Sequence, residues 1–480
     1  MARGDRRHDT GAFGRWFPVV LVLAILASAG AAYRFDLGHR WFGTGEPDPD
    51  TAPAAVEPPE GLELPALTRP APVADPLHQG GALSPEKVRR AVDQFLRDRD
   101  LGKSVHAVVA GMGGGAPALS VGADPGMPAS TTKLLTTTAA LDTLGPDHTF
   151  ETTVVGGGGD RIVLVGGGDP FLARRPDSSG GWPHGADILS LARRTAAALD
   201  HRGRGKVRVG YDDSLFTGPA ENPEWRKSYV PDGVVSPITA LWVDEGVDAS
   251  GFGRVADPSA EAAAEFVRAL ERSGIRVTGT PVPERSHRGA RVLARVTSAP
   301  LAQVVEQVLS VSDNEGAEVL ARHVGLAVSG KGSSAAGTDA VLSTLRRLGV
   351  RTDGATVYDG SGLSRKDRID PDTLVDVLRV ASSRNHPDLR AVVTGLPVAG
   401  FTGSLAFRFD DAPAAGRGHV RAKTGTLTGV SALAGVATDL DGVPMVFALI
   451  ADRVKLRDTL DARDDLDDLA AALGSCHCAA

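Results

Sequence analysis

The chain has 480 residues, of which 42% are hydrophobic and 23% are charged, with a formal net charge of −7. This composition is ordinary for a globular protein of two or three domains, and it lacks the clustered basic charge by which proteins bind nucleic acids. The two cysteines of the chain both lie in the last five residues, so they provide no disulfide framework of the kind that stabilises small secreted domains.

The N-terminus carries an apolar segment that resembles a membrane-targeting sequence. Four arginines in residues 1–15 precede the run WFPVVLVLAILASAGAAY at 16–33. The run is longer than a usual signal-peptide core and close to the lower limit for a membrane span. The basic tail predicts that residues 1–15 stay in the cytoplasm and that the chain after the span lies outside. We expect a single-pass membrane helix, with cleavage after the signal-peptidase-like ASAGAA and secretion as the alternative.

Residues 34–83 are expected to form a linker, because Pro and acidic residues dominate them and they show no apolar period. A helix then begins, with Ser84 as its N-cap and Pro85 at its first position. Apolar residues recur in this segment at helical spacing. Helix capping therefore explains the Ser-x-x-Lys pattern formed by Ser84 and Lys87, and we assign it no catalytic role.

A strand is predicted at 104–112 and a helix at 130–144. The segment 151–296 has a different sequence pattern, in which short β-like runs alternate with Gly-rich turns. One helix is expected inside it, at 259–274. The sequence GGGDP at 166–170 is interpreted as a turn, because the Lys-Ser/Thr pair of a phosphate-binding loop does not follow it.

Helical periodicity returns after residue 297, with two helices on either side of Ser312-Asp313-Asn314. Three strand-like runs follow, GHVRAKTGTL, VSALAGVATDL and VPMVFALIAD. The pair Asp441-Gly442 predicts a hairpin between the last two runs. A closing helix is expected at 454–474.

The order of these elements predicts an α/β (α+β) fold with one interrupted domain. The interrupted domain is expected to comprise 84–150 and 297–474, with a strand-rich inserted region at 151–296. We expect the C-terminal tail with Cys476 and Cys478 to be frayed. Its Cys-His-Cys sequence offers too few ligands by itself for a metal site.

Ser130 and Lys133 have the spacing of a nucleophile and its base. Residues three apart share one face of a helix, so the Lys amine can reach the Ser hydroxyl. Burial lowers the pKa of a lysine, which then can take the hydroxyl proton. Backbone N–H groups at the start of the helix can stabilise a developing oxyanion. The pattern is common on its own, so its meaning depends on partners elsewhere in the chain.

Two further patterns supply candidate partners. Ser312 and Asn314 lie at the junction of two apolar helices, from which they can project into a cleft. Lys423-Thr424-Gly425 lies in a strand-like run, where the Lys can attract a substrate carboxylate, the Thr can hydrogen-bond it and the Gly lets a substrate backbone approach. A second Ser-x-Asn pattern, at Ser383-Arg384-Asn385, is interpreted as a loop after a helix.

The three motifs, in this order, resemble the active site of penicillin-binding proteins and β-lactamases. The separation of 182 positions between Ser130 and Ser312 resembles the class C low-molecular-mass penicillin-binding proteins, the D-Ala-D-Ala carboxypeptidase/endopeptidases of peptidase family S13 of the DacB type. The stretches YDGSGLSRKDRI, GLPVAGFTGSLAFRF, VGGGDPFL and SPITALWVDEG also resemble this family. The resemblance covers 84–474 and implies a β-lactamase/transpeptidase-like fold, with helices flanking an antiparallel sheet.

The resemblance also implies a role for each motif residue. Ser130 is the acylated nucleophile, Lys133 is its base, and Ser312 passes a proton to the leaving amine. Asn314 holds Lys133 and the substrate amide, and Lys423 assists proton transfer. The resemblance implies that Thr424 binds the terminal carboxylate and that Gly425 lies beside it. The N–H groups of Thr426 and Ser130 form the oxyanion hole. Arg365 is the last residue implied in substrate binding.

Arg365 is the weakest of these candidates. Its expected partner is a carboxylate on the third residue of the stem peptide, which is a diamino acid. The alternative is that Arg365 is an ordinary surface residue. His323 is expected to be structural, and we assign no role to His419. Asp359 precedes a glycine, so we interpret it as a turn residue rather than an acid catalyst.

The resemblance therefore implies a serine-type D-Ala-D-Ala carboxypeptidase, and we expect it to need neither a metal nor a cofactor. Its expected partners are peptidoglycan stem peptides, β-lactams as covalent inhibitors, and the cytoplasmic membrane through the N-terminal helix. A β-lactamase or esterase with the same serine, and a non-catalytic wall-binding protein, are the alternatives. The preference for carboxypeptidase or endopeptidase activity stays open.

Overall fold

The computed structural model describes residues 81–480, except 123, 177–182, 184 and 411–415. The predicted membrane helix at 16–33 and nearly all of the linker predicted at 34–83 lie outside the described residues. Within the described part of the chain, no helix is both long enough and apolar enough to cross a membrane.

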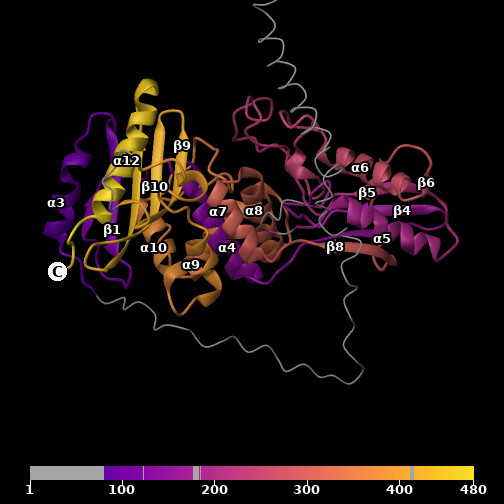
Figure 1. Ribbon diagram of the computed structural model, residues 1–480, viewed down its shortest axis with the longest axis horizontal. Helices are drawn as coiled ribbons and strands as arrows, with labels where there is room; N and C mark the ends of the chain where they lie inside the picture. Colours follow the sequence, from indigo (N-terminus) through magenta and orange to yellow (C-terminus); the bar gives the residue numbers. More distant parts are fainter. Residues whose placement is uncertain (1–80, 123, 177–182, 184, 411–415) are drawn as a thin grey trace, which may run out of the picture. The chain divides into compact units, whose positions relative to one another are not determined.

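A five-stranded antiparallel sheet carries the core of the region with the three motifs (Figure 1). Side chains alternate between the two faces of a strand, so Val108 and Val109 enter different hydrophobic cores. Because both faces are covered, the two interior strands at 430–438 and 444–452 read as almost unbroken apolar runs. In spatial order the strands are β2 (Leu119–Val121), β1 (Ser104–Gly111), β11 (Pro444–Asp452), β10 (Val430–Thr438) and β9 (Val420–Leu427).

Helices pack on both faces of this sheet, as Figure 1 shows. One face carries α3 (Pro85–Leu96) and α12 (Thr459–Gly474). The opposite face carries α4 (Lys133–Leu144), α7 (Leu301–Val311), α8 (Asn314–Ser329), α9 (Ser334–Arg347), α10 (Pro371–Ser382) and α11 (Ala391–Thr394). Short 3-10 turns lie in this region at η2 (Ala129–Thr132), η4 (Pro387–Leu389), η5 (Gly403–Leu405) and η7 (Leu456–Asp458), and η3 (Asp244–Gly246) lies in the segment between the first and second motifs.

A second sheet of six strands lies in the segment between the first and second motifs. It is mixed, because β4 pairs in parallel with β5 and antiparallel with β3. Helices α5 (Ile188–Asp200) and α6 (Pro258–Arg272) share a core with it around Phe266. Its strands are β6 (Arg276–Val277), β5 (Lys206–Asp212), β4 (Arg161–Val165), β3 (Glu151–Gly156) and β8 (Val292–Thr297), with β7 (Val282–Pro283) paired to β5. The domain boundaries assigned from the sequence stay a prediction.

Several predicted elements are confirmed at nearly the expected positions. Ser84 caps α3, since its Oγ accepts a hydrogen bond from Lys87 N. The helix expected at 259–274 is α6, and the hairpin between β10 and β11 turns at Gly442, which has a positive φ of 78°. A positive φ is readily available to glycine alone, and this explains the Asp-Gly signal.

The C-terminal tail is ordered, so our expectation of a frayed end is wrong. Cys478 is fully buried in the core beside α12 and forms a disulfide with Cys476. Its N–H donates to Asp439 Oδ2 at 3.0 Å, and its carbonyl accepts from Ser84 N at 2.9 Å. The sequence around the cysteines does not reveal this docking, because both partners lie far away in the chain.

Candidate active site

Ser130 lies in the 3-10 turn η2, directly before the helix α4. The α-helix begins at Lys133, and not at Ser130 as the sequence predicted. Ala129 has a φ of 47°, a left-handed conformation that is uncommon for a residue with a side chain. Such backbone conformations persist where the surroundings hold them in place, and they cluster at functional sites.

Two glycines allow the neighbouring segments to press against this turn. A Cβ atom added to Gly362 would lie 1.9 Å from Ala129 O, and one added to Gly425 would lie 2.7 Å from Pro128 O. Gly425 belongs to β9, the edge strand of the five-stranded sheet. The third motif is therefore held directly against the turn that presents Ser130.

Lys133 is fully buried and contacts three oxygen atoms. Its Nζ lies 2.9 Å from Ser130 Oγ, 2.8 Å from Asn314 Oδ1 and 2.8 Å from Ser361 O. Burial lowers the pKa of Lys133 from 10.5 to about 8, although nearby carboxylates, Asp313 first among them, act in the opposite direction. A lysine with this pKa is partly neutral near pH 7.5, so it can accept the proton of the Ser130 hydroxyl.

Ser312 and Asn314 lie in the junction between α7 and α8. Ser312 ends α7 in a left-handed conformation with φ 63° and ψ 40°, and Asp313 caps α8 by accepting a hydrogen bond from Gly316 N. Asn314 Nδ2 donates to Val234 O at 2.9 Å. Because a backbone carbonyl only accepts, this bond fixes the orientation of the Asn314 amide and directs its Oδ1 at Lys133.

Lys423 and Thr424 come from the edge strand β9. Lys423 is fully buried, and its Nζ donates to Thr424 O at 2.9 Å. Burial, and then the positive charges of Lys133 and Arg408, hold the pKa of Lys423 well below its usual value. The Thr424 hydroxyl lies 3.0 Å from Ser404 Oγ, so two hydroxyl groups adjoin at this position.

A groove with a volume of about 490 Å³ brings the first two motifs together with the end of β9. Ser130, Ser312, Asn314 and Thr426 line it. Lys133 and Lys423 lie beneath this surface, since both are fully buried.

Arg365 is not part of this groove. It lines an adjoining cavity of about 300 Å³ together with His106 and Asp452. The two spaces share Thr428 and Leu456 as lining residues. Arg226 and Tyr229, which line the groove, interact electrostatically with Arg365, so Arg365 lies beside the groove.

The family model described as D-Ala-D-Ala carboxypeptidase 3 (S13) matches residues 88–250 and 249–473. The chain belongs to this family. It is 35% identical over 422 residues to a carboxypeptidase of Mycobacterium tuberculosis, which covers 85% of this chain and 87% of the relative. It is 37% identical over 364 residues to carboxypeptidase DacB of Mycolicibacterium smegmatis, covering 74% and 77% of the two chains. The predicted family and the predicted enzyme class are confirmed.

The fold has a counterpart among solved structures. Penicillin binding protein 4 (dacB) from Haemophilus influenzae superposes with a TM-score of 0.66 at 22% identity, over 80% of this chain and 98% of that chain. At this identity the match establishes the fold alone. The predicted architecture, an antiparallel sheet flanked by helices, is thereby confirmed for this S13 chain.

Sequence reasoning missed that carboxyl groups are buried around Lys133 in the S13 site. Glu318 accepts hydrogen bonds from Gly360 N and Ser361 N at 2.9 Å and 2.8 Å. Asp359 is a turn residue, as predicted, since its Oδ1 accepts from Gly362 N at 2.6 Å. It is nevertheless fully buried, and its charge acts on Lys133. The sequence offered one signal for Glu318. It lies one helical turn after Asn314, so both side chains are expected on the same face of the helix.

The two histidines singled out in the sequence have different surroundings. His323 is structural, as predicted: it is buried, its Nε2 lies 2.9 Å from Gly168 O, and its ring stacks on Phe150. Burial lowers its pKa to about 4, so it is neutral at physiological pH. His419 is exposed and directly precedes β9, with its Nδ1 3.3 Å from Thr438 O.

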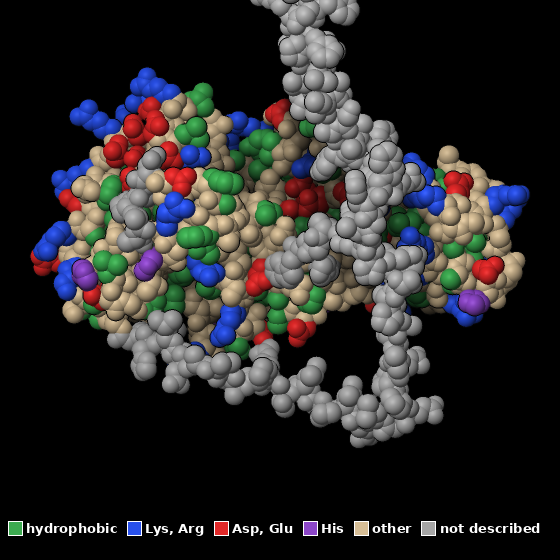
Figure 2. Space-filling view, viewed as in Figure 1, with side chains coloured by type: hydrophobic (Ala, Val, Ile, Leu, Met, Phe, Trp, Pro, Cys, Tyr) green, Lys and Arg blue, Asp and Glu red, His purple; other side chains and the backbone are tan. Residues whose placement is uncertain are grey.

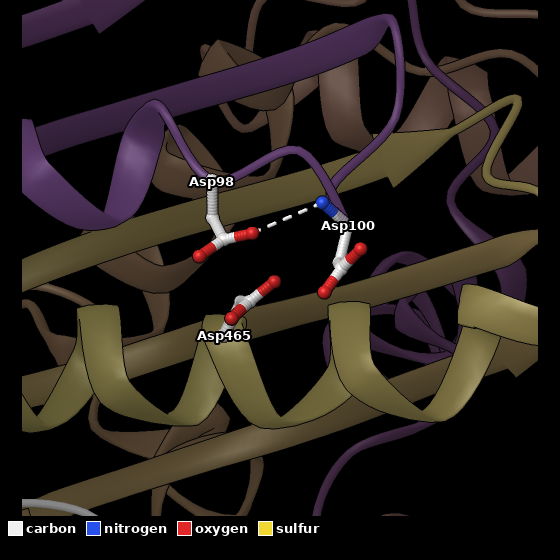
Figure 3. Close-up of side chains that lie close together, drawn as sticks. All are labelled: Asp98, Asp100 and Asp465. Atoms are coloured by element: carbon white, nitrogen blue, oxygen red, sulfur yellow. Dashed lines mark hydrogen bonds between the residues drawn. The ribbon is translucent and has the colours of Figure 1, made fainter.

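Three aspartates gather at the other side of the sheet, and Figure 3 shows them facing one another. Asp98 Oδ1 accepts a hydrogen bond from Asp100 N at 3.0 Å, and Asp465 of α12 completes the group. Burial and the neighbouring carboxylates raise the pKa of Asp465 to about 7. Figure 2 shows acidic side chains gathered over part of α12. Since Asp98 is exposed and the other two are only half-buried, we assign no ion to this group.

Proposed function

We propose that the chain is a penicillin-binding D-Ala-D-Ala carboxypeptidase/endopeptidase that cleaves peptidoglycan stem peptides through an acyl-enzyme on Ser130. One observation carries this proposal: the buried amine of Lys133 lies within hydrogen-bonding distance of both Ser130 Oγ and Asn314 Oδ1. A nucleophile, its base and a group that orients the base are the parts that an acyl transfer needs.

The proposed reaction has two steps. Neutral Lys133 takes the proton of Ser130 as its Oγ attacks the carbonyl carbon of the penultimate D-Ala. The amine of the terminal residue, or of a cross-link, leaves with a proton that Ser312 passes on. Water then hydrolyses the ester and restores the Ser130 hydroxyl. In the first step the backbone N–H groups of Ser130 and Thr426 donate hydrogen bonds to the oxyanion that forms on the carbonyl oxygen.

Substrate recognition is assigned to the end of β9. The Thr424 hydroxyl, beside the buried amine of Lys423, is the proposed site of the terminal carboxylate. Gly425 lets β9 lie directly against the turn that carries Ser130, which places Thr424 and Thr426 beside the nucleophile. Arg365, in the adjoining cavity, is proposed to bind a carboxylate on the third residue of the stem peptide.

We also propose that the catalytic region acts outside the cytoplasm, anchored by residues 16–33. The disulfide between Cys476 and Cys478 supports this location, because disulfides persist mainly in oxidising compartments. Fractionation of cells followed by protease treatment of intact spheroplasts tests the proposal. Protection of the catalytic region from the protease contradicts it.

Fluorescent penicillin and defined muropeptides together test the activity. We expect the wild-type protein to be labelled stably, Ser130→Ala to lose the label, and mass spectrometry to show the loss of one D-Ala or of a cross-link. Rapid release of the label indicates a β-lactamase or esterase. Absence of labelling in the wild type contradicts the proposal.

A further inference from the structure

The three contacts of Lys133 impose a direction on its lone pair. A neutral amine has two N–H bonds and one lone pair. Asn314 Oδ1 and Ser361 O can only accept, so they take the two N–H bonds, at 2.8 Å each. The lone pair is then left for the third neighbour, Ser130 Oγ, at 2.9 Å. The Ser361 carbonyl is thus as necessary to this arrangement as the Asn314 amide.

A buried carboxyl group fixes the position of that carbonyl. Glu318 Oε1 accepts from both Gly360 N and Ser361 N. We propose that Glu318 is a positioning residue for catalysis, which holds the Ser361 carbonyl so that the lone pair of Lys133 points at Ser130. This inference rests on the proposed roles of Ser130 and Lys133.

The helix α8 supplies both orienting groups from one face. Asn314, Glu318 and Arg322 follow one another at intervals of four residues, which places them along a single stripe of the helix. Glu318 and Arg322 are each 1% exposed. Arg322 donates to backbone carbonyls, among them Pro219 O at 2.7 Å, and its charge acts on Glu318. Ionisable groups are rarely buried in this way unless they are paired or serve a function.

The segment that Glu318 holds has no freedom to shift toward the helix. A Cβ atom added to Gly360 would lie 2.7 Å from Ala317 O, so the backbone of the segment lies directly on α8. On the other side, Thr136 Oγ1 donates to Gly360 O at 2.7 Å. The carbonyl of Ser361 is therefore held between α8 and α4, and Glu318 supplies two of its anchoring hydrogen bonds.

The protonation state of Glu318 suggests a conservative substitution. Burial, and then the charge of Asp359, raise the pKa of Glu318 to about 8, so the carboxyl is largely neutral at pH 7. A glutamine at this position keeps a carbonyl oxygen for the two N–H groups and changes the charge little. An alanine removes the acceptor and leaves Gly360 N and Ser361 N without a partner.

The test measures the acylation of full-length protein by fluorescent penicillin in a stopped-flow instrument at pH 7. The time courses separate the dissociation constant of the non-covalent complex from the acylation rate constant. We expect Glu318→Ala to lower the rate constant at least tenfold with less than a threefold change in the dissociation constant. We expect Glu318→Gln to restore the rate constant to within threefold of wild type.

A second pair of variants covers the case that Glu318→Ala does not fold. Thr136→Val removes the side-chain hydrogen bond to Gly360 O and is expected to lower the rate constant threefold or more. Thr138→Val is the matched control on α4, because its buried Oγ1 has no hydrogen-bond partner among the described residues. We expect Thr138→Val to acylate at the wild-type rate.

Some outcomes overturn the inference and leave the proposed function standing. Acylation of Glu318→Ala or Thr136→Val at the wild-type rate, with labelling still dependent on Ser130, is one. Equal loss of rate in Glu318→Gln and Glu318→Ala is another. Labelling that persists in Ser130→Ala instead contradicts the proposed function itself.

Discussion

Lys133 Nζ and Asn314 Oδ1 form a hydrogen bond of 2.8 Å across 181 residues of sequence. The same Asn314 amide donates to Val234 O, in the segment between the two motifs. The inserted segment is therefore part of the framework that holds the catalytic base. A displacement of either contact changes the direction in which Lys133 meets Ser130.

The acylation rate should rise with pH around the pKa of Lys133. Burial lowers this pKa to about 8, and only the neutral amine can accept the proton of Ser130. Below pH 8 the neutral fraction falls about tenfold for each pH unit, so the rate should fall in proportion. The rate constant for penicillin acylation, measured from pH 6 to 9.5, checks this. A flat profile contradicts the role of Lys133 as base.

The substitution Asn314→Asp should shift that profile to higher pH. A carboxylate at this position lies within 3 Å of Nζ and stabilises the charged amine, which raises the pKa of Lys133 by about 1–3 units. At pH 7 we expect acylation to be about tenfold slower or more. Asn314→Leu serves as the control, since it removes the contacts without adding charge. Equal midpoints in Asn314→Asp and wild type contradict the prediction.

Thr424→Val should weaken the binding of peptides that end in a free carboxylate. The substitution removes one hydroxyl and preserves the shape of the side chain, and a hydrogen bond to a charged group contributes about 1.5–3 kcal/mol. We expect KM for such peptides to rise about tenfold or more, with a smaller change in kcat. The same peptide with a C-terminal amide is the control, and it should respond little. An equal response of both peptides indicates another site for the carboxylate.

Asp169→Asn should stabilise the fold at alkaline pH. Asp169 is 3% exposed, and its Oδ2 has no hydrogen-bond partner among the described residues. Burial raises its pKa from 3.8 to about 7, so the folded state binds a proton that the unfolded state releases. The stability that this proton provides is complete below pH 4 and is lost as pH rises through 7. Asn carries no charge to bury.

Urea denaturation at pH 5 and pH 8.5 measures this effect. We expect Asp169→Asn to exceed wild type by on the order of 2 kcal/mol at pH 8.5, with a smaller difference at pH 5. An advantage that is the same at both pH values rules out the titration of Asp169 as its cause.

The docked C-terminal tail should contribute to stability without affecting acylation. Cys478→Ala removes a fully buried side chain and the disulfide, so we expect it to cost about 1–3 kcal/mol in the free energy of unfolding. Cys476→Ala breaks the same disulfide but leaves Cys478 in the core, and it should cost less. Denaturation by urea and penicillin labelling are the two measurements. A frayed tail would make both substitutions neutral.

The sequence was informative where chemistry depends on residue type and local spacing. Ser130 with Lys133, Ser312 with Asn314, and the run from Lys423 were each recognisable, and their common order predicted one site. The helix caps and the Asp-Gly hairpin were equally readable, because turn geometry depends on a few adjacent residues.

Other features were hidden because their causes lie in tertiary contacts. Glu318 is ordinary in sequence, and its function emerges only where α8 meets the segment at Gly360. The start of α4 was misplaced at Ser130, since packing against Gly362 and Gly425 decides the conformation of Ala129. The order of the C-terminal tail, likewise, depends on residues near Ser84 that no local pattern connects with it.

Because a long inserted segment separates Lys133 from Asn314, the parts of the active site are synthesised at different times. A ribosome that adds about 5–20 residues per second needs on the order of 10–40 s to proceed from Lys133 to Asn314, and longer to reach Lys423. Until Asn314 and Ser361 have been synthesised, Lys133 lacks two of its three contacts. A polypeptide that ends before Ser361 therefore carries Ser130 without the two groups that orient its base.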